Sequence, residues 1–157
     1  MSVFKTTFSR ALKVAVTPNC DIPFPNVIVS ETTSDVSFNS LVDNSVNFEE
    51  LNVKAGDIVY NTDTYEGATV VGITNPTNIL LNADIFLSSG VNYTIYQASP
   101  QTGLGNQGCF LYIAEDTNYT VITIGGDEVE FKTPIKGTIL PVQVRKVILG
   151  GNCVALW

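Results

Sequence analysis

The strongest signal of the fold is YTVITIGGDEVEFK, residues 119–132, which has the pattern of two strands around a turn. A β-branched run ends at Gly125-Gly126-Asp127, and a second run then alternates, with Val129 and Phe131 on one side and charged residues on the other. A glycine-rich turn between two such runs is typical of a β-hairpin. The period of two also places one face of the hairpin on a core and the other in solvent. We therefore predict an antiparallel sheet built around this hairpin.

Short strand patterns continue on both sides of the hairpin. Residues 12–16 alternate before Thr17-Pro18-Asn19, and residues 138–147, which follow Gly137, predict one long strand. Pro141 must lie at an edge or a bulge of that strand because it has no N–H to donate. No window of eleven or more residues shows helical spacing of its apolar positions. We predict an all-β fold whose parent unit is a small antiparallel, jelly-roll-like β-sandwich.

The amino-acid composition changes between these two ends of the chain. Up to about residue 47 it is rich in Ser, Thr, Asn and Asp, which predicts loops with weak strands, and residues 48–51 could form one helical turn. Short strand patterns then occupy residues 57–60, 68–73, 78–81 and 92–96. Their spacing favours a β-meander or a small SH3-like barrel. We predict a β-sandwich base domain formed by residues 1–30 and 108–157, and an inserted β subdomain with its linker at residues 31–107.

Composition excludes several classes of protein. The chain has 157 residues, of which 45% are hydrophobic and 15% charged, so it can bury a core without help. Its 8 Lys and Arg against 15 Asp and Glu give a net charge of -7, which argues against binding to nucleic acid. No run of 18 apolar residues predicts a membrane span, and the first ten residues do not have the pattern of a signal peptide.

The chain also lacks some of the residue types that most often carry out catalysis. The chain has no His, which removes the commonest general base and most zinc sites. Cys20, Cys109 and Cys153 are far apart and odd in number, so we expect buried thiols in a reducing cytosol rather than disulfides or a metal pair.

The carboxylates are scattered over turns and polar strand faces. The pairs Glu49-Glu50, Glu115-Asp116 and Asp127-Glu128 could hold calcium between loops, yet none has the spacing of an EF-hand. A carboxylate hydrolase would need two acids about 5 to 9 Å apart in a cleft. We predict no catalytic residue, no cofactor and no metal site.

Two further sequence patterns could indicate a binding site. Residues 103–108 match the spacing GxGxxG, but an apolar strand pattern follows where a nucleotide site needs a helix, so we interpret them as a connector. In the insert, Tyr60, Tyr65, Tyr93 and Tyr96 could form a stacking surface for sugars. A receptor-binding or glycan-binding module on a tail or fibre is therefore the alternative function, and core packing is the competing use of these rings.

Four stretches, taken in order, carry a resemblance. They are Asp21-Ile22-Pro23-Phe24-Pro25; Leu111-Tyr112-Ile113 followed by the Gly125-Gly126-Asp127 hairpin; residues 137–147; and the terminal Val154-Ala155-Leu156-Trp157. This ordered set resembles the head spike base and head decoration proteins of gene transfer agents and tailed phages, many of them marine. In the shorter members the first stretch runs almost directly into the second, whereas here residues 31–107 intervene. The inserted block is itself similar to β modules of marine phage virion proteins.

The resemblance implies a non-enzymatic virion protein that is assembled in the host cytoplasm. It would sit on the capsid as a homo-oligomer, a trimer or pentamer, with capsid or other virion proteins as partners and neither nucleic acid nor membrane. Apolar strand and terminal residues are the expected interface, because aromatic anchors dominate buried contacts. These candidate interface residues are Ile139, Leu140, Pro141, Val142, Leu156 and Trp157. Alternatively, Trp157 fills the core of its own subunit.

Overall fold

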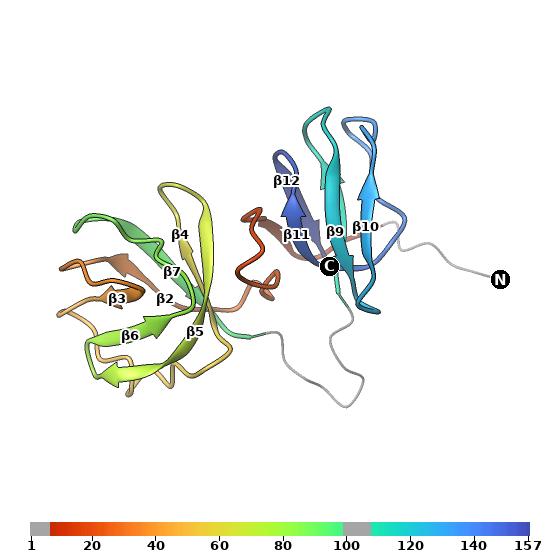
Figure 1. Cartoon of the computed structure of the whole chain (residues 1–157). Coiled ribbons are helices and arrows are strands. Elements are labelled where there is room, and N and C mark those ends of the chain that lie inside the picture. The colour runs from red at the N-terminus through yellow and green to blue at the C-terminus, as the bar shows by residue number, and fades with distance from the viewer. Residues whose placement is uncertain (1–6, 99–107) are drawn as a thin grey trace.

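The structure, a computed structural model, describes residues 7–98 and 108–157. The predicted all-β class is confirmed: every element in this part of the chain is a strand and all strand pairs are antiparallel. None of the described segments forms a helix long and apolar enough to cross a membrane. The strands form two units that lie side by side, with the N-terminal segment passing between them (Figure 1).

The base domain is a sandwich of two small sheets. One has the strand order β1-β12-β8 and the other β10-β9-β11. Their bounds are β1 Ala11–Lys13, β8 Phe110–Ile113, β9 Tyr119–Thr123, β10 Glu128–Phe131, β11 Val144–Leu149 and β12 Cys153–Leu156. The buried residues of the two sheets share one hydrophobic core, which includes Leu111, Val121, Val147 and Ala155. The sandwich therefore joins strands from both ends of the sequence.

The insert is a six-stranded sheet in the order β2-β7-β4-β5-β6-β3. Its strands are β2 Val27–Thr32, β3 Ser40–Val42, β4 Ile58–Asn61, β5 Glu66–Asn75, β6 Asn78–Leu81 and β7 Asn92–Tyr96. The sheet is open, with a β4-β5-β6 meander at its centre, so the closed-barrel alternative is wrong. A single bridge between Asp35 and Val42 connects the chain after β2 to β3. The insert has its own core, in which Phe48 and Tyr93 are fully buried.

The junction between the two units differs from the sequence prediction. We expected residues 1–30 in the base domain, but β2 begins at Val27 and pairs with β7 of the insert. The boundary predicted after residue 30 is therefore four residues too late. The reason is that Val27-Ile28-Val29 has the same apolar character whichever sheet it joins, so only the pairing partner assigns it.

The predicted hairpin is confirmed. Glu128 of β10 pairs with Ile122 of β9, and the register continues to Phe131 opposite Tyr119. Along β10 the charged positions are exposed while Val129 and Phe131 are half-buried, as the alternation predicts. Gly126 occupies the turn with a φ of +93°, a conformation that glycine adopts without strain.

The long strand predicted at residues 138–147 is wrong in its first half. Regular pairing begins only at Val144, the first residue of β11. Before it, Ile139 forms one bridge with Tyr112, and the Leu140 amide donates to the Leu111 carbonyl. Pro141 follows directly and has no N–H to donate, so the regular pairing is interrupted there. It resumes at Val144, which bridges Cys109 next to β8 and also begins the pairing of β11 with β9, so one sequence run serves both sheets.

Candidate functional site

The two units are held together by the segment that connects β1 to β2, residues 14–25, which we name the connecting segment. Its amides bind the base domain: Val14 N donates to Cys153 O at 3.1 Å, and Ile22 N donates to Arg145 O at 2.7 Å. Ile22 also reaches the core of the base domain. The connecting segment is therefore an integral part of the sandwich rather than a free linker.

The same segment also binds the insert. The Ala15 amide donates to the Tyr60 hydroxyl at 3.3 Å. The Asn19 carbonyl accepts two hydrogen bonds, from Thr69 Oγ1 at 3.0 Å and from Asn82 Nδ2 at 2.7 Å. A small buried cluster of Ala15, Cys20, Ile58 and Tyr60 fills the space between the segment and the insert sheet. These contacts fix the insert against the base domain.

A groove of about 910 Å³ opens at this junction. Its lining comes from the connecting segment, the insert and the base domain. The residues that line it are Pro18, Asn19, Cys20, Asp21, Ile22, Pro23, Gly56, Ile58, Thr69, Val71, Asn82, Ala98, Ile124, Arg145 and Lys146. Its lining contains both apolar and polar side chains, and one of the apolar ones, Val71, is 51% exposed. We treat this groove as the candidate site because three parts of the chain converge on it.

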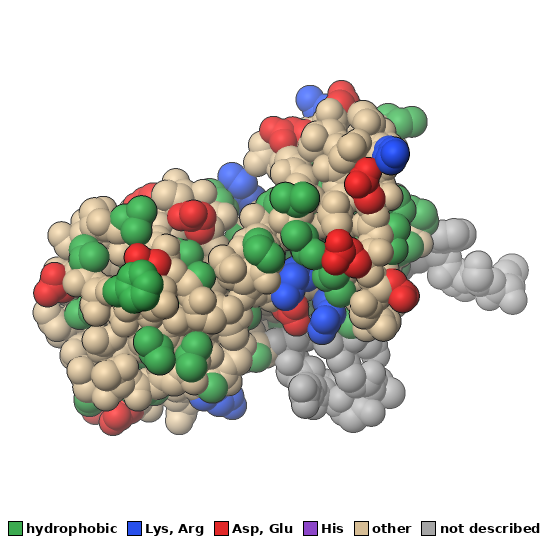
Figure 2. Space-filling model, viewed as in Figure 1, with side chains coloured by type: hydrophobic (Ala, Val, Ile, Leu, Met, Phe, Trp, Pro, Cys, Tyr) green, Lys and Arg blue, Asp and Glu red, His purple; other side chains and the backbone are tan. Residues whose placement is uncertain are grey.

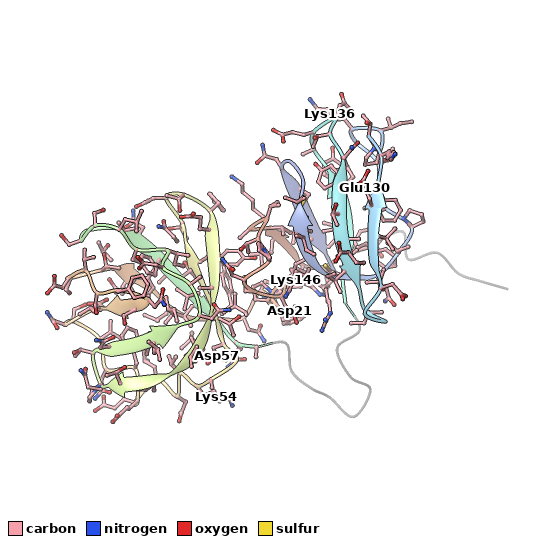
Figure 3. All side chains as sticks on the ribbon, viewed as in Figure 1. Asp21, Lys54, Asp57, Glu130, Lys136 and Lys146 are labelled. Carbon is pink, nitrogen blue, oxygen red and sulfur yellow. The ribbon has the colours of Figure 1, made fainter. Side chains whose placement is uncertain are left out.

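Two cationic side chains and one carboxylate line the groove. Lys146 Nζ lies 3.6 Å from Asp21 Oδ1, and Arg145 Nη1 lies 3.9 Å from Asp21 Oδ2 (Figure 3 labels Asp21 and Lys146). Lys146 also donates to the Pro18 carbonyl at 3.3 Å. Arg145 Nε is buried and has no hydrogen-bond partner among the described residues. Two cations thus share one carboxylate.

These cations contrast with the charge of the insert. Residues 27–98, which contain the insert, carry nine acidic side chains and one cation, Lys54. The remaining residues carry six acidic and seven basic side chains. Figure 2 shows Lys and Arg side chains where the two units meet, whereas acidic side chains are spread over the insert. The insert is therefore strongly acidic, whereas the rest of the chain is close to neutral.

The groove does not bring together two acids for hydrolysis. Asp21 is the one carboxylate among the described residues that line it, and it faces Arg145 and Lys146. Cys20 is also in the lining, but burial and the neighbouring Asp21 charge raise the pKa of its thiol to about 12. A thiol with such a pKa stays protonated near neutral pH and is a poor nucleophile. The charged side chains of the described lining are therefore two cations and one carboxylate.

One of the carboxylate pairs considered for calcium, Glu115-Asp116, accepts hydrogen bonds from other parts of the base domain. Glu115 accepts from the Asn152 amide and from Asn152 Nδ2, both at 2.8 Å, and Asp116 accepts from the Lys136 amide at 3.1 Å. Within residues 7–98 and 108–157 there is no group of three or more His, Cys, Asp or Glu side chains placed to hold a metal ion. The pattern at residues 103–108 lies, except for Gly108, outside the described residues.

The four insert tyrosines do not form a common surface. Tyr60 and Tyr93 are buried, with 1% and 0% of their surface exposed, so placing them on the surface was wrong. Tyr93 donates to the carboxylate of Asp43 at 2.7 Å. Tyr65 is 38% exposed and faces Lys13, whose Nζ lies 3.6 Å from the ring centre, while Tyr96 packs edge-on against Tyr60. These rings are used for packing within and between the units.

The candidate interface residues also divide by burial. Leu140 is buried in the core of the base domain, so its placement in an interface was wrong. Val142, Leu156 and Trp157 are half-buried, and Trp157 packs edge-on against Phe24 with ring centres 5.6 Å apart. Ile139 and Pro141 remain exposed.

Exposed Ile139 belongs to a patch that the sequence analysis did not identify as a unit. Its bridge partner Tyr112 is 38% exposed, and Ile135 in the preceding turn is 74% exposed. We name Tyr112, Ile135 and Ile139 the apolar patch. The alternation in Leu111-Tyr112-Ile113 was the available signal, since it turns Tyr112 away from the core on which its neighbours pack.

Comparison with known proteins adds no relative. No protein-family model, no curated protein and no solved structure with which the chain was compared matches it.

Proposed function

We propose that this protein is a non-enzymatic structural component of a phage virion, of the head decoration or spike base type. It binds capsid or fibre subunits as a symmetric oligomer. The proposal comes from the ordered resemblance, whose stretches all belong to the base domain and the connecting segment: residues 21–25, β8, the β9–β10 turn, residues 137–147 and the end of the chain.

The observation that carries this proposal is the apolar patch. Three large apolar side chains lie exposed on neighbouring segments of the base domain, and one of them, Ile135, exposes 74% of its surface. Grouped apolar side chains on a folded surface mark sites of protein contact, because covering them removes apolar area from water. Their position on β8 and in the segment that leads to Ile139 lies in the base domain, which also carries the resemblance, and this supports the proposal.

The binding proposal is tested by cosedimentation with tailed-phage heads. The purified chain, incubated with empty heads, is expected to pellet with them. Ile135→Asp/Ile139→Asp is expected to weaken binding at least about tenfold, because it places two carboxylates in an apolar contact.

The matched control is Leu149→Asp, which changes a side chain that is 64% exposed outside the apolar patch. It is expected to bind like the wild type. A chain that remains in the supernatant, or binding that both variants reduce equally, contradicts the proposal.

A further inference from the structure

The groove between the units contains positive charge that the described residues do not fully neutralise. The N–O distances from Arg145 and Lys146 to Asp21 are 3.9 and 3.6 Å, longer than the roughly 2.7–2.9 Å of a charge-assisted hydrogen bond. Two cations against one carboxylate leave one net positive charge, and Arg145 Nε has no partner in the described chain. Next to this charge lie apolar side chains, including the exposed Val71. The groove is thus complementary to a segment that presents carboxylates beside apolar side chains.

The far end of the insert presents such a segment. Phe38 and Leu87 each expose 77% of their surface, more than any other large hydrophobic residue described. The loops that carry them meet where the Asn39 amide donates to Asp84 Oδ1 at 3.1 Å. Asp35 is exposed beside them, at the bridge to β3. We name Asp35, Phe38, Asp84 and Leu87 the insert tip.

The insert tip cannot reach the groove of its own chain. β3, which follows Phe38 directly, is an edge strand of the sheet, whereas the groove residues Ile58, Thr69 and Val71 lie on the central strands β4 and β5. Figure 1 shows β3 on the side of the insert that faces away from the base domain. A contact between tip and groove must therefore join two molecules.

We propose that the groove accepts the insert tip of a second copy, so that copies associate head to tail. The inference rests on the proposed function, to which it adds the oligomer contact. A contact between two tips would bring carboxylates together, and a contact between two grooves would bring cations together. Tip against groove is the arrangement that pairs unlike charges and also covers Phe38 and Leu87.

A contact of this kind uses two different surfaces of the chain. Such heterologous contacts close into rings where the rotation between neighbours permits it, and otherwise extend into filaments. Because part of the attraction is between partly exposed charges, the contact must weaken as salt is added.

Sedimentation velocity tests the contact with two charge-reversal variants. The groove variant is Arg145→Glu/Lys146→Glu and the tip variant is Asp35→Lys/Leu87→Lys. The wild type is expected to sediment as an oligomer whose dissociation constant rises at least about tenfold between low salt and about 0.5 M salt. Each variant alone is expected to sediment as a monomer. An equimolar mixture of the two is expected to regain oligomers, since each tip then meets a groove of opposite charge.

The control variant Lys54→Glu/Lys132→Glu makes the same change in net charge as the groove variant, at two exposed side chains outside the groove and the tip. It is expected to sediment like the wild type. Circular dichroism of every variant shows whether it is folded, and the tip variant tests the contact without altering the groove.

The contact is overturned if the wild type is monomeric, if oligomers persist unchanged in a folded tip variant, or if two folded variants fail to complement each other. In the second case the chain still assembles, through another surface, and binding to phage heads remains a separate measurement. Failure of this contact is therefore distinguishable from failure of the proposed function.

Discussion

Asp43 shows how a single buried carboxylate organises the insert. Its side chain is fully buried and accepts hydrogen bonds from Tyr93 Oη at 2.7 Å, from Ser45 N and Oγ at 2.9 and 2.6 Å, and from Ser34 Oγ at 3.2 Å. Burial alone would raise the pKa of this carboxyl, but the hydrogen bonds outweigh burial and hold the pKa below its ordinary value of 3.8. The charged form is therefore the one that the fold stabilises.

We expect Asp43→Asn to lower the free energy of unfolding by about 2–3 kcal/mol, because hydrogen bonds to a charged group are lost and an amide N–H₂ faces donors. Urea titration at neutral pH measures the loss. Glu130→Gln, an exposed change on β10, is the control and should leave the free energy of unfolding unchanged. An equally stable Asp43→Asn variant would show that the network contributes nothing.

The same carboxylate predicts a dependence on pH. Because the folded-state pKa of Asp43 lies below the unfolded value, its contribution is complete above about pH 5 and is lost as the pH falls through the folded-state pKa, below 3.8. The difference in stability between wild type and Asp43→Asn should therefore shrink on acidification. Urea titrations from pH 7 to pH 3 measure it; a difference that stays constant over this range contradicts the assignment.

The three cysteines are expected to be inert in the folded chain. All are free and buried, and burial raises the pKa of each thiol to about 12. Since the thiolate is the reactive form, a disulfide reagent at pH 8 should label them slowly under native conditions and rapidly in urea. Fast labelling of any one of them without denaturant would show that its site opens.

For single residues, the sequence predicted the burial of the three cysteines but not that of Tyr60, Tyr93 and Leu140. The buried thiols were predicted, since isolated cysteines in apolar runs behave as small hydrophobes. Tyr60 and Tyr93 were misplaced because the local sequence around a strand tyrosine does not show whether its hydroxyl contacts water or a buried partner. Their partners, Ala15 and Asp43, lie 45 and 50 residues away, and no local pattern reveals such a pairing.

Among the elements, the β9–β10 hairpin depends on one glycine of its turn. Gly126 has a positive φ, whereas Gly125 does not, and a Cβ added at Gly125 would meet only ordinary contacts. Gly126→Ala is expected to lower the free energy of unfolding by roughly 1–2 kcal/mol, because L-residues are strained at positive φ. Gly125→Ala is the matched control and should be close to neutral. Equal effects of the two changes in thermal unfolding would contradict this assignment of the turn.

The elements that the sequence predicted best were those with a complete local signal. The hairpin has alternation on both sides of its turn, the four insert strands are short apolar runs bounded by turn residues, and all of these strands are present. β11 was extended too far because the apolar pattern continues across Pro141 while the pairing partner changes. The first four residues of β2 were given to the wrong unit for a related reason, since sheet membership depends on distant partners.

On the scale of the whole molecule, the two units are coupled by close packing at the junction. A Cβ added to Gly67 of β5 would lie 2.6 Å from Cys20 Sγ and 3.2 Å from the Tyr60 ring. The connecting segment can approach the insert only because this residue has no side chain. The groove, and with it the candidate site, depends on that approach.

Gly67→Ala is therefore expected to cost about 1–3 kcal/mol of the free energy of unfolding. Gly72→Ala on the same strand is the control, because its Cβ would meet nothing within 4 Å. Combining Gly67→Ala with Cys20→Ala removes the clashing sulfur and should recover part of the loss, which a double-mutant cycle in urea measures. Strictly additive losses would show that the two residues are not in contact.

The groove itself could not be predicted from the sequence. Asp21 and Lys146 are 125 positions apart, and the insert that forms one wall separates the two halves of the base domain. The adjacent cations Arg145 and Lys146 were visible as a pair, but only the fold shows that they face a cavity in an otherwise acidic chain.

We propose that this protein works by binding neighbouring subunits on a virion. Electron cryomicroscopy of tailed-phage heads incubated with the purified chain tests it most directly. We expect added density that repeats at one class of capsid position. This density should accommodate the base domain with the apolar patch against the capsid. Heads that show no added density at saturating concentrations of folded protein would contradict it.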